Sequence, residues 1–140
     1  MTRKPRLLIA EDDPAARELI EAAAERCGAF ESFRIVEDGQ AVLNVLWRTI
    51  CAEKPEELPH LILTDLNMPG LSGIDLTRDL KAHPETSAIP VTIITSFGSE
   101  ADRRLAAEAG CSAYYERPRT LAQLMEILRQ IARLGKPTRG

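Results

Sequence analysis

Short apolar runs alternate along the chain with longer segments in which apolar residues recur every three or four positions. The short runs are typical of buried strands, and the longer spacing is typical of helices that bury one face. The predicted strands cover residues 6–10, 33–36, 61–64, 91–95 and 112–115. The predicted helices cover residues 14–26, 40–52, 74–83, 100–109 and 120–134.

This succession of strand–helix units predicts an α/β fold with a doubly wound, five-stranded parallel sheet that carries helices on both faces. Several strands are continuous apolar runs, as a sheet covered on both faces requires. At 140 residues the chain is long enough for one domain with a substantial core and too short for two ordinary ones. We therefore expect a single domain over residues 1–140, with a core at about 6–134 and a tail at 135–140.

Polar side chains follow four of the five predicted strands. They are Glu11, Asp12 and Asp13 after the first strand, Asp65 and Asn67 after the third, Thr95 and Ser96 after the fourth, and Arg117 after the fifth. Because ligands of open α/β sheets bind beyond the carboxyl ends of the strands, we expect these side chains to meet at one edge. Crowded carboxylates repel one another and favour a divalent cation, and hard oxygen ligands suit Mg²⁺, or Mn²⁺ in its place.

Asp65 ends an apolar strand, where a carboxylate is costly to bury without a partner. An aspartate carboxylate can act as a nucleophile and form an acyl phosphate. Phosphoryl transfer mainly needs positioning and neutralisation of the phosphoryl oxygens, which a cation, Arg117 and the Thr95 hydroxyl would supply. Each residue alone also fits a structural role, since Asp12 or Asp13 suits the N-cap of the following helix. Their joint arrangement at the strand ends favours function.

The same strand ends carry four motifs: IAEDDP at 9–14, LTDLNMPGLSG at 63–73, PVTIITS at 90–96 and AGCSAYYERP at 109–118. Together they resemble the receiver domain of two-component response regulators, over about residues 6–134. The resemblance implies the (βα)5 flavodoxin-like receiver fold. It also implies a stand-alone regulator that accepts a phosphoryl group from a sensor histidine kinase. No enzymatic activity is expected beyond Mg²⁺-dependent self-phosphorylation and autodephosphorylation.

The resemblance assigns four residues to the phosphorylation and metal site. Asp65 matches the phosphorylated aspartate, and Glu11 and Asp12 match the acidic pair that organises the metal, with Asp12 as the direct ligand. Asn67 matches the residue whose backbone carbonyl binds Mg²⁺. The expected metal site therefore consists of Glu11, Asp12, Asp65 and Asn67.

Three further residues match the positions that bind the phosphoryl group or respond to it. Thr95 matches the switch hydroxyl, and Tyr114 matches the aromatic switch residue. Arg117 stands where the family has a lysine. Lysine is a compact charge, whereas the planar arginine fork can still pair with a phosphoryl oxygen. We therefore expect phosphorylation to be retained, with an altered phosphoryl lifetime or switching strength.

A finer resemblance concerns one group within the family. The polar loop at 53–60, the TDLNMPG motif at 64–70 and the HPETSAIPV segment at 83–91 resemble single-domain regulators that partner bacterial phytochromes. This resemblance implies that the phosphoryl donor is a light-sensing histidine kinase.

Charge and hydropathy exclude several other classes of function. The net charge of −3 gives no basic field for nucleic acid, and no apolar run approaches the roughly 20 residues of a membrane span. The apolar part of the N-terminus is too short for a signal peptide, so we expect a cytoplasmic protein. The three cysteines have no metal-site spacing and are expected to be free thiols.

No helix-turn-helix or second core follows the predicted domain within these 140 residues, so the expected output is an interface with an unknown downstream protein. In the last predicted helix, Ile127, Ile131 and Leu134 form an apolar stripe beside a core stripe that includes Leu124 and Leu128. The second stripe fits equally a homodimer through the last helices and a wide core-facing stripe.

Three alternative functions fit parts of this pattern. A pseudo-receiver would share the fold and act only as an interaction module, which Arg117 favours and the intact acidic residues oppose. A phosphatase with an aspartyl nucleophile would need a second acid two residues after Asp65, where Asn67 stands. Flavin binding would need a phosphate-binding loop after the first strand. The sequence leaves open the cognate kinase, the target and whether phosphorylation favours or opposes dimerisation.

Overall fold

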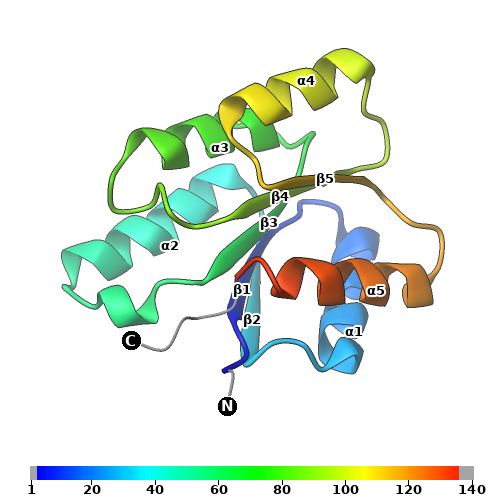
Figure 1. Cartoon of the computed structure of the whole chain (residues 1–140), viewed down its shortest axis with the longest axis horizontal. Coiled ribbons are helices and arrows are strands. Elements are labelled where there is room, and N and C mark those ends of the chain that lie inside the picture. The colour runs from blue at the N-terminus through cyan, green and yellow to red at the C-terminus, as the bar shows by residue number, and fades with distance from the viewer. Residues whose placement is uncertain (1–2, 136–140) are drawn as a thin grey trace.

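Five strands alternate with five α-helices in the computed structural model, which describes residues 3–135 (Figure 1). The strands are β1 (Arg6–Ala10), β2 (Ser32–Val36), β3 (Leu61–Asp65), β4 (Val91–Thr95) and β5 (Ala113–Glu116). The helices are α1 (Pro14–Cys27), α2 (Gly39–Cys51), α3 (Gly73–Ala82), α4 (Glu100–Ala109) and α5 (Leu121–Ala132), with a 3₁₀ turn, η1, at Pro55–Glu57. The predicted elements agree with these bounds to within two residues. Most of the predicted tail, residues 136–140, lies outside the described residues.

All five strands are parallel and lie in the order β2-β1-β3-β4-β5. Helices α1 and α5 cover one face, and α2, α3 and α4 cover the other (Figure 1). The predicted doubly wound α/β sheet is confirmed. The strand order reverses between β1 and β3, which places a crevice between the loops that follow these two strands. None of the helices between residues 3 and 135 is long and apolar enough to cross a membrane.

The core has two sides because the central strands are apolar on both faces. Ile9, Leu63 and Ile94 are buried beneath α1 and α5. Leu8 and Ile62 point to the opposite side, where they pack with residues of α2 and α3. Successive side chains of a strand alternate between faces, so a fully covered strand must be apolar at consecutive positions.

Helix α5 decides between the two interpretations of its apolar stripe that the sequence left open. Ile131 is fully buried together with Leu124 and Leu128, and Ile127 packs against the same core cluster. Leu134 lies beyond the end of α5 and is 45% exposed. The interpretation of Ile127, Ile131 and Leu134 as a partner-facing stripe is therefore wrong, and a wide core-facing stripe explains the first two. The homodimer stays a prediction.

Candidate functional site

The residues predicted to form the site lie at the carboxyl-end edge of the sheet. Asp65 is the last residue of β3, and Thr95 is the last residue of β4. Glu11 directly follows β1, and Arg117 directly follows β5. Parallel pairing brings these ends together, so Glu11 and Arg117 are in contact although 106 positions separate them in the chain.

Three carboxylates form a cluster at this edge. One oxygen from each of Glu11, Asp12 and Asp65 lies within 4.8 Å of the other two. Glu11 is buried, with 1% of its surface exposed, whereas Asp12 is exposed and Asp65 is intermediate. A set of hard oxygen donors at this spacing fits a divalent cation such as Mg²⁺ or Mn²⁺. The expected grouping of these acids is confirmed.

The adjacent Asp13 has a structural role. Its side chain caps α1 by accepting a hydrogen bond from the Ala16 backbone N–H at 2.9 Å. Proline follows it at the first helical position, where its fixed φ favours helix initiation. Its own backbone N–H donates to Glu11 Oε2 at 3.2 Å. The cap therefore uses Asp13 and leaves Asp12 for the acidic cluster.

Arg117 supplies the positive charge beside the cluster. Its Nη2 lies 2.5 Å from Glu11 Oε1 and 3.7 Å from Asp65 Oδ2, and its side chain is 14% exposed. Its backbone N–H donates to the Thr95 carbonyl at 2.8 Å, which fixes the start of the side chain. The second amino group, Nη1, is buried and has no hydrogen-bond partner within residues 3–135. The guanidinium thus bridges two acids and keeps one donor free.

Burial shifts the pKa of two of the three acids in the cluster. Burial raises the pKa of Glu11, the Arg117 charge opposes this rise, and the negative charge of Asp65 adds to it. Burial also raises the pKa of Asp65, again opposed by Arg117. A single guanidinium does not fully compensate these carboxylates, so the electrostatics favour an additional cation.

The turn after Asp65 is built from backbone contacts. The Asn67 N–H donates to Asp65 Oδ1 at 3.4 Å, and the Gly73 N–H donates to the Leu66 carbonyl at 2.9 Å. A Cβ on Gly73 would lie 2.5 Å from the Asp65 carbonyl oxygen. The start of α3 can pack against Asp65 only because residue 73 has no side chain. Asn67 is exposed and follows Asp65 in the chain as expected.

Sequence reasoning missed this role of Gly73. The sequence carries a signal for this role. Gly73 is a poor helix former, yet it is the first residue of α3 and directly follows the capping residue Ser72. A glycine at such a position often marks a close approach of two backbone segments.

Thr95 and Tyr114, the predicted switch residues, lie beneath the loop between β4 and α4. Thr95 is fully buried, and its Oγ1 accepts a hydrogen bond from the Phe97 N–H at 3.3 Å. The Tyr114 hydroxyl is buried without a hydrogen-bond partner among the described residues, and Arg103 stacks over the ring at 4.7 Å. A Cβ on Gly98 would overlap this hydroxyl. Gly98 therefore makes room for the ring, which sequence reasoning missed.

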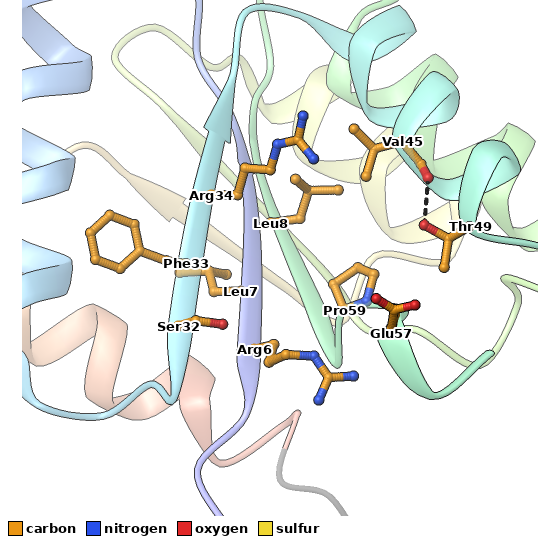
Figure 2. Close-up of a pocket in the computed structure, with 10 residues that line it drawn as sticks. All are labelled: Arg6, Leu7, Leu8, Ser32, Phe33, Arg34, Val45, Thr49, Glu57 and Pro59. Atoms are coloured by element: carbon orange, nitrogen blue, oxygen red, sulfur yellow. Dashed lines mark hydrogen bonds between the residues drawn. The ribbon is translucent and has the colours of Figure 1, made fainter. Parts of the chain in front are cut away.

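A pocket of about 250 Å³ is lined by residues other than those of the predicted site (Figure 2). Its lining comes from β1, β2, α2 and the segment around η1, toward the amino ends of the strands. The guanidinium of Arg6 in its wall donates to the carbonyls of Glu56 and Leu58. This contact ties the loop before β3 to β1. None of the residues predicted to form the site lines this pocket.

Comparison with known proteins identifies the family. Residues 7–129 match the family model described as the response regulator receiver domain. The chain belongs to this family. It is 30% identical over 133 residues to the phosphate regulon transcriptional regulatory protein PhoB of Rhizobium meliloti (strain 1021), covering 95% of this chain and 54% of that protein. The chain therefore spans about half the length of the first curated relatives that it matches.

Solved structures share the receiver fold. The phosphorylated cyanobacterial phytochrome response regulator RcpA has a TM-score of 0.80 at 24% identity, covering 96% of this chain and 99% of that one. The response regulator RPA3017 in red light signalling of R. palustris has a TM-score of 0.79 at 25% identity, with the same coverage. The Mn²⁺-bound form of response regulator Rcp1 has a TM-score of 0.74 at 25% identity, covering 91% of each chain. The expected resemblance to phytochrome-associated regulators is confirmed.

Proposed function

We propose that this receiver domain accepts a phosphoryl group on Asp65 from a phosphohistidine of a sensor histidine kinase, with Mg²⁺ as the cofactor. The observation that carries the proposal is the placement of Asp65 at the strand end. There its carboxylate lies beside Asp12 and Glu11 and 3.7 Å from the Arg117 guanidinium. The Mn²⁺-bound structure of Rcp1 supports a divalent cation in a domain of this kind.

In the proposed transfer, an Asp65 carboxylate oxygen attacks the phosphorus atom of the donor. A P–O bond forms while the P–N bond to the donor histidine breaks, and the leaving imidazole keeps the electron pair and takes up a proton from solvent. The product is an acyl phosphate on Asp65, which water later hydrolyses. A divalent cation bound by Asp12, Asp65 and the Asn67 carbonyl would neutralise charge on the phosphoryl oxygens.

Arg117 and Thr95 would complete the phosphoryl site. Arg117 Nη2 lies 3.7 Å from Asp65 Oδ2, so the guanidinium would neutralise charge on a phosphoryl oxygen bound there. Thr95 Oγ1 donates no hydrogen bond to a described residue, so its proton is available for a phosphoryl oxygen. Both residues act by orienting the group and neutralising its charge, which is where most catalysis of phosphoryl transfer originates.

The likeness to RcpA and RPA3017 supports a light-sensing histidine kinase as the donor. The output would be a change of a protein-binding surface in the cytoplasm, with a homodimer through α4 and α5 as the first candidate. Leu105 on α4 is 40% exposed and is the apolar side chain available there, whereas the apolar residues of α5 are largely buried.

The test is intact-mass spectrometry after incubation with acetyl phosphate and Mg²⁺. The wild-type protein should gain one phosphoryl group, and Asp65→Asn should gain none. Asp13→Asn is the matched control, because asparagine caps a helix as well as aspartate and Asp13 only caps α1. An unmodified wild-type protein would refute the proposal and favour the interaction module without phosphorylation. Phosphotransfer from purified histidine kinases, including phytochromes, then identifies the donor.

A further inference from the structure

Strand β2 is an outer strand of the sheet and is open to solvent. It pairs with β1 on one side, and no strand of residues 3–135 lies on its other side. Ser32 and Arg34 are exposed, and Phe33, Ile35 and Val36 are only partly buried, whereas β1, β3 and β4 are almost entirely buried. An edge strand presents unpaired backbone N–H and C=O groups, which can pair with another extended segment.

Hollows border β2 on both faces of the sheet. The pocket of about 250 Å³ lies on the face that α2 covers, where α2 packs over β1 (Figure 2). Leu8, Val45 and Pro59 give this pocket an apolar wall. On the opposite face, Phe33 and Ile35 line a second hollow of about 290 Å³ together with residues of α1. Successive side chains of a strand added beside β2 would alternate between the two hollows.

Arg34 supplies an unpaired charge at this edge. Its side chain is directed toward α2 (Figure 2), and it makes no ion pair with another described residue. The other charged residues of the pocket pair within the chain. Arg6 Nη1 lies 3.5 Å from Glu31 Oε2, and Glu57 Oε2 lies 3.7 Å from Lys54 Nζ. The pocket therefore offers one free guanidinium beside an apolar wall, which suits a carboxylate with apolar neighbours.

We propose that the β2 edge binds an extended segment of a partner protein, in which an acidic residue lies between apolar ones, and that this segment adds to the sheet beside β2. The backbone of the segment would pair with the outer N–H and C=O groups of β2. Its acidic side chain would lie against Arg34, and apolar side chains two positions away would enter the pocket on the same face. The proposal does not depend on phosphorylation of Asp65.

The residues next to the acidic one would point to the opposite face. There they would pack on the partly buried Phe33 and Ile35. Arg17 and Glu21 line the same hollow and contribute one charge of each sign, so this face favours uncharged side chains. The two faces together select an alternating apolar segment with a single central acid.

The position of Arg34 also disfavours a second copy of this chain as the occupant. Arg34 is the central residue of β2, which covers Ser32–Val36. Two β2 strands paired antiparallel over their full length would place the two Arg34 side chains directly opposite each other. Like charges at opposite positions destabilise strand pairing, whereas an acid at that position stabilises it.

The first experiment measures binding of a synthetic peptide, Ser-Thr-Leu-Val-Asp-Val-Leu-Thr-Ser, by fluorescence anisotropy. Its sequence reads the same in both directions, so it offers the same side chains to a parallel or an antiparallel arrangement. It should bind the wild-type protein with a Kd below about 1 mM. The matched peptide with lysine in place of aspartate should bind at least about 5-fold more weakly, because it meets Arg34 with a like charge.

Charge reversal on the protein tests the assigned contact. Arg34→Glu should weaken binding of the aspartate peptide at least about 5-fold and strengthen binding of the lysine peptide by a similar factor. Arg104→Glu is the matched control, because Arg104 is exposed on α4, whose buried residues pack near β4 and β5. It should leave both affinities unchanged. An unchanged preference for aspartate in Arg34→Glu would overturn the proposal.

The second experiment asks whether the peptide binds as a strand. An added strand uses the N–H groups of alternate residues, so N-methylation of one alternate set should abolish binding and N-methylation of the other should affect it much less. Amide hydrogen exchange of β2 should slow when the unmodified peptide binds. Equal effects of the two sets, unchanged exchange, or no binding at about 1 mM peptide would each refute an added strand. A dimer of the free protein with protected β2 amides would assign the edge to a second copy and would overturn the proposal as well.

Discussion

Gly73→Ala is predicted to damage both the stability of the protein and its reaction at Asp65. The added Cβ would lie 2.5 Å from the Asp65 carbonyl oxygen and 3.2 Å from the Leu66 Cα, which are both backbone atoms. Ordinary contact begins at 3.4 Å, so the turn after β3 must move by about 0.9 Å. Backbone atoms cannot relieve the overlap by changing a side-chain rotamer. The strain therefore passes directly to the segment that carries Asp65, the proposed phosphoryl acceptor.

Two opposing effects determine the size of the stability change. Alanine favours a helix over glycine by about 1 kcal/mol, which helps α3. Overpacking against fixed neighbours costs about 1–3 kcal/mol, occasionally more, and here the neighbour is backbone. We expect the cost to lie at the upper end of that range, which leaves a net loss of about 2 kcal/mol. A displacement of about 1 Å at the reacting group can slow a reaction by about 100-fold, so the rate should fall by at least about 10-fold.

The assay combines urea unfolding with the rate of phosphorylation by acetyl phosphate at saturating Mg²⁺. Gly28→Ala is the matched control, because Gly28 has a φ of 67° and nothing within 4 Å of an added Cβ. It should lose about 1 kcal/mol through backbone strain and keep the wild-type rate, because Gly28 caps the C-terminal end of α1, whereas the acidic cluster lies beside the start of that helix. Gly73→Ala with an unchanged rate would refute the reasoning, because it would mean that the turn yields without moving Asp65.

Two further predictions concern a pH-dependent contact and the buried tyrosine. His60 Nδ1 accepts a hydrogen bond from the Arg6 N–H at 2.9 Å, and burial followed by the positive charge of Arg6 lowers the pKa of His60. As the pH falls, His60 is therefore protonated at a higher pH in the unfolded chain than in the folded protein. The free energy of unfolding should decrease as the pH drops below about 6.5, and His60→Asn should reduce this dependence. Gly98→Ala should destabilise the protein by about 1–3 kcal/mol, and adding Tyr114→Phe should restore at least half of the loss by removing the overlapped hydroxyl.

Urea unfolding at several pH values tests the first of these, and identical pH dependence in wild type and His60→Asn would contradict it. For the second, Tyr114→Phe alone is the control. It should be neutral or stabilising, because the hydroxyl is buried without a partner among the described residues. If Tyr114→Phe gave Gly98→Ala no recovery, the overlap would not be the cause of the loss.

The elements of the fold were predictable because apolar spacing reports directly which side of each element is buried. Leu61 to Thr64 form a continuous buried run, which only a strand covered on both faces explains, and β3 is such a strand. Asp65 could be placed at the carboxyl-end edge of the sheet because the carboxyl ends of parallel strands lie on the same side. The same rule groups Asp65 with Glu11 and Asp12, which the structure places together.

The width of the buried face of α5 was not predictable. The positions of Ile127 and Ile131 on the helix follow from its period, but the area that the sheet and α1 cover does not. For this reason the sequence left both interpretations of the stripe open. The close neighbours of Gly73 and Gly98 could not be predicted from the sequence, because the need for glycine at each position comes from groups that the tertiary structure brings against it.

By itself, the sequence determined which polar residues follow the strands and that they meet at the carboxyl ends of the sheet, because both follow from local period and from the shared direction of the strands. Only the tertiary structure decided how those residues pair. Arg117 binds Glu11 at 2.5 Å and stands back from Asp65 at 3.7 Å. The pairing of Arg117 with Glu11 depends on how two loops, 106 positions apart in the chain, place their side chains. It also depends on how deeply each carboxylate is buried. Burial and distance set the strength of an ion pair, and neither is written in the spacing of residues along the chain.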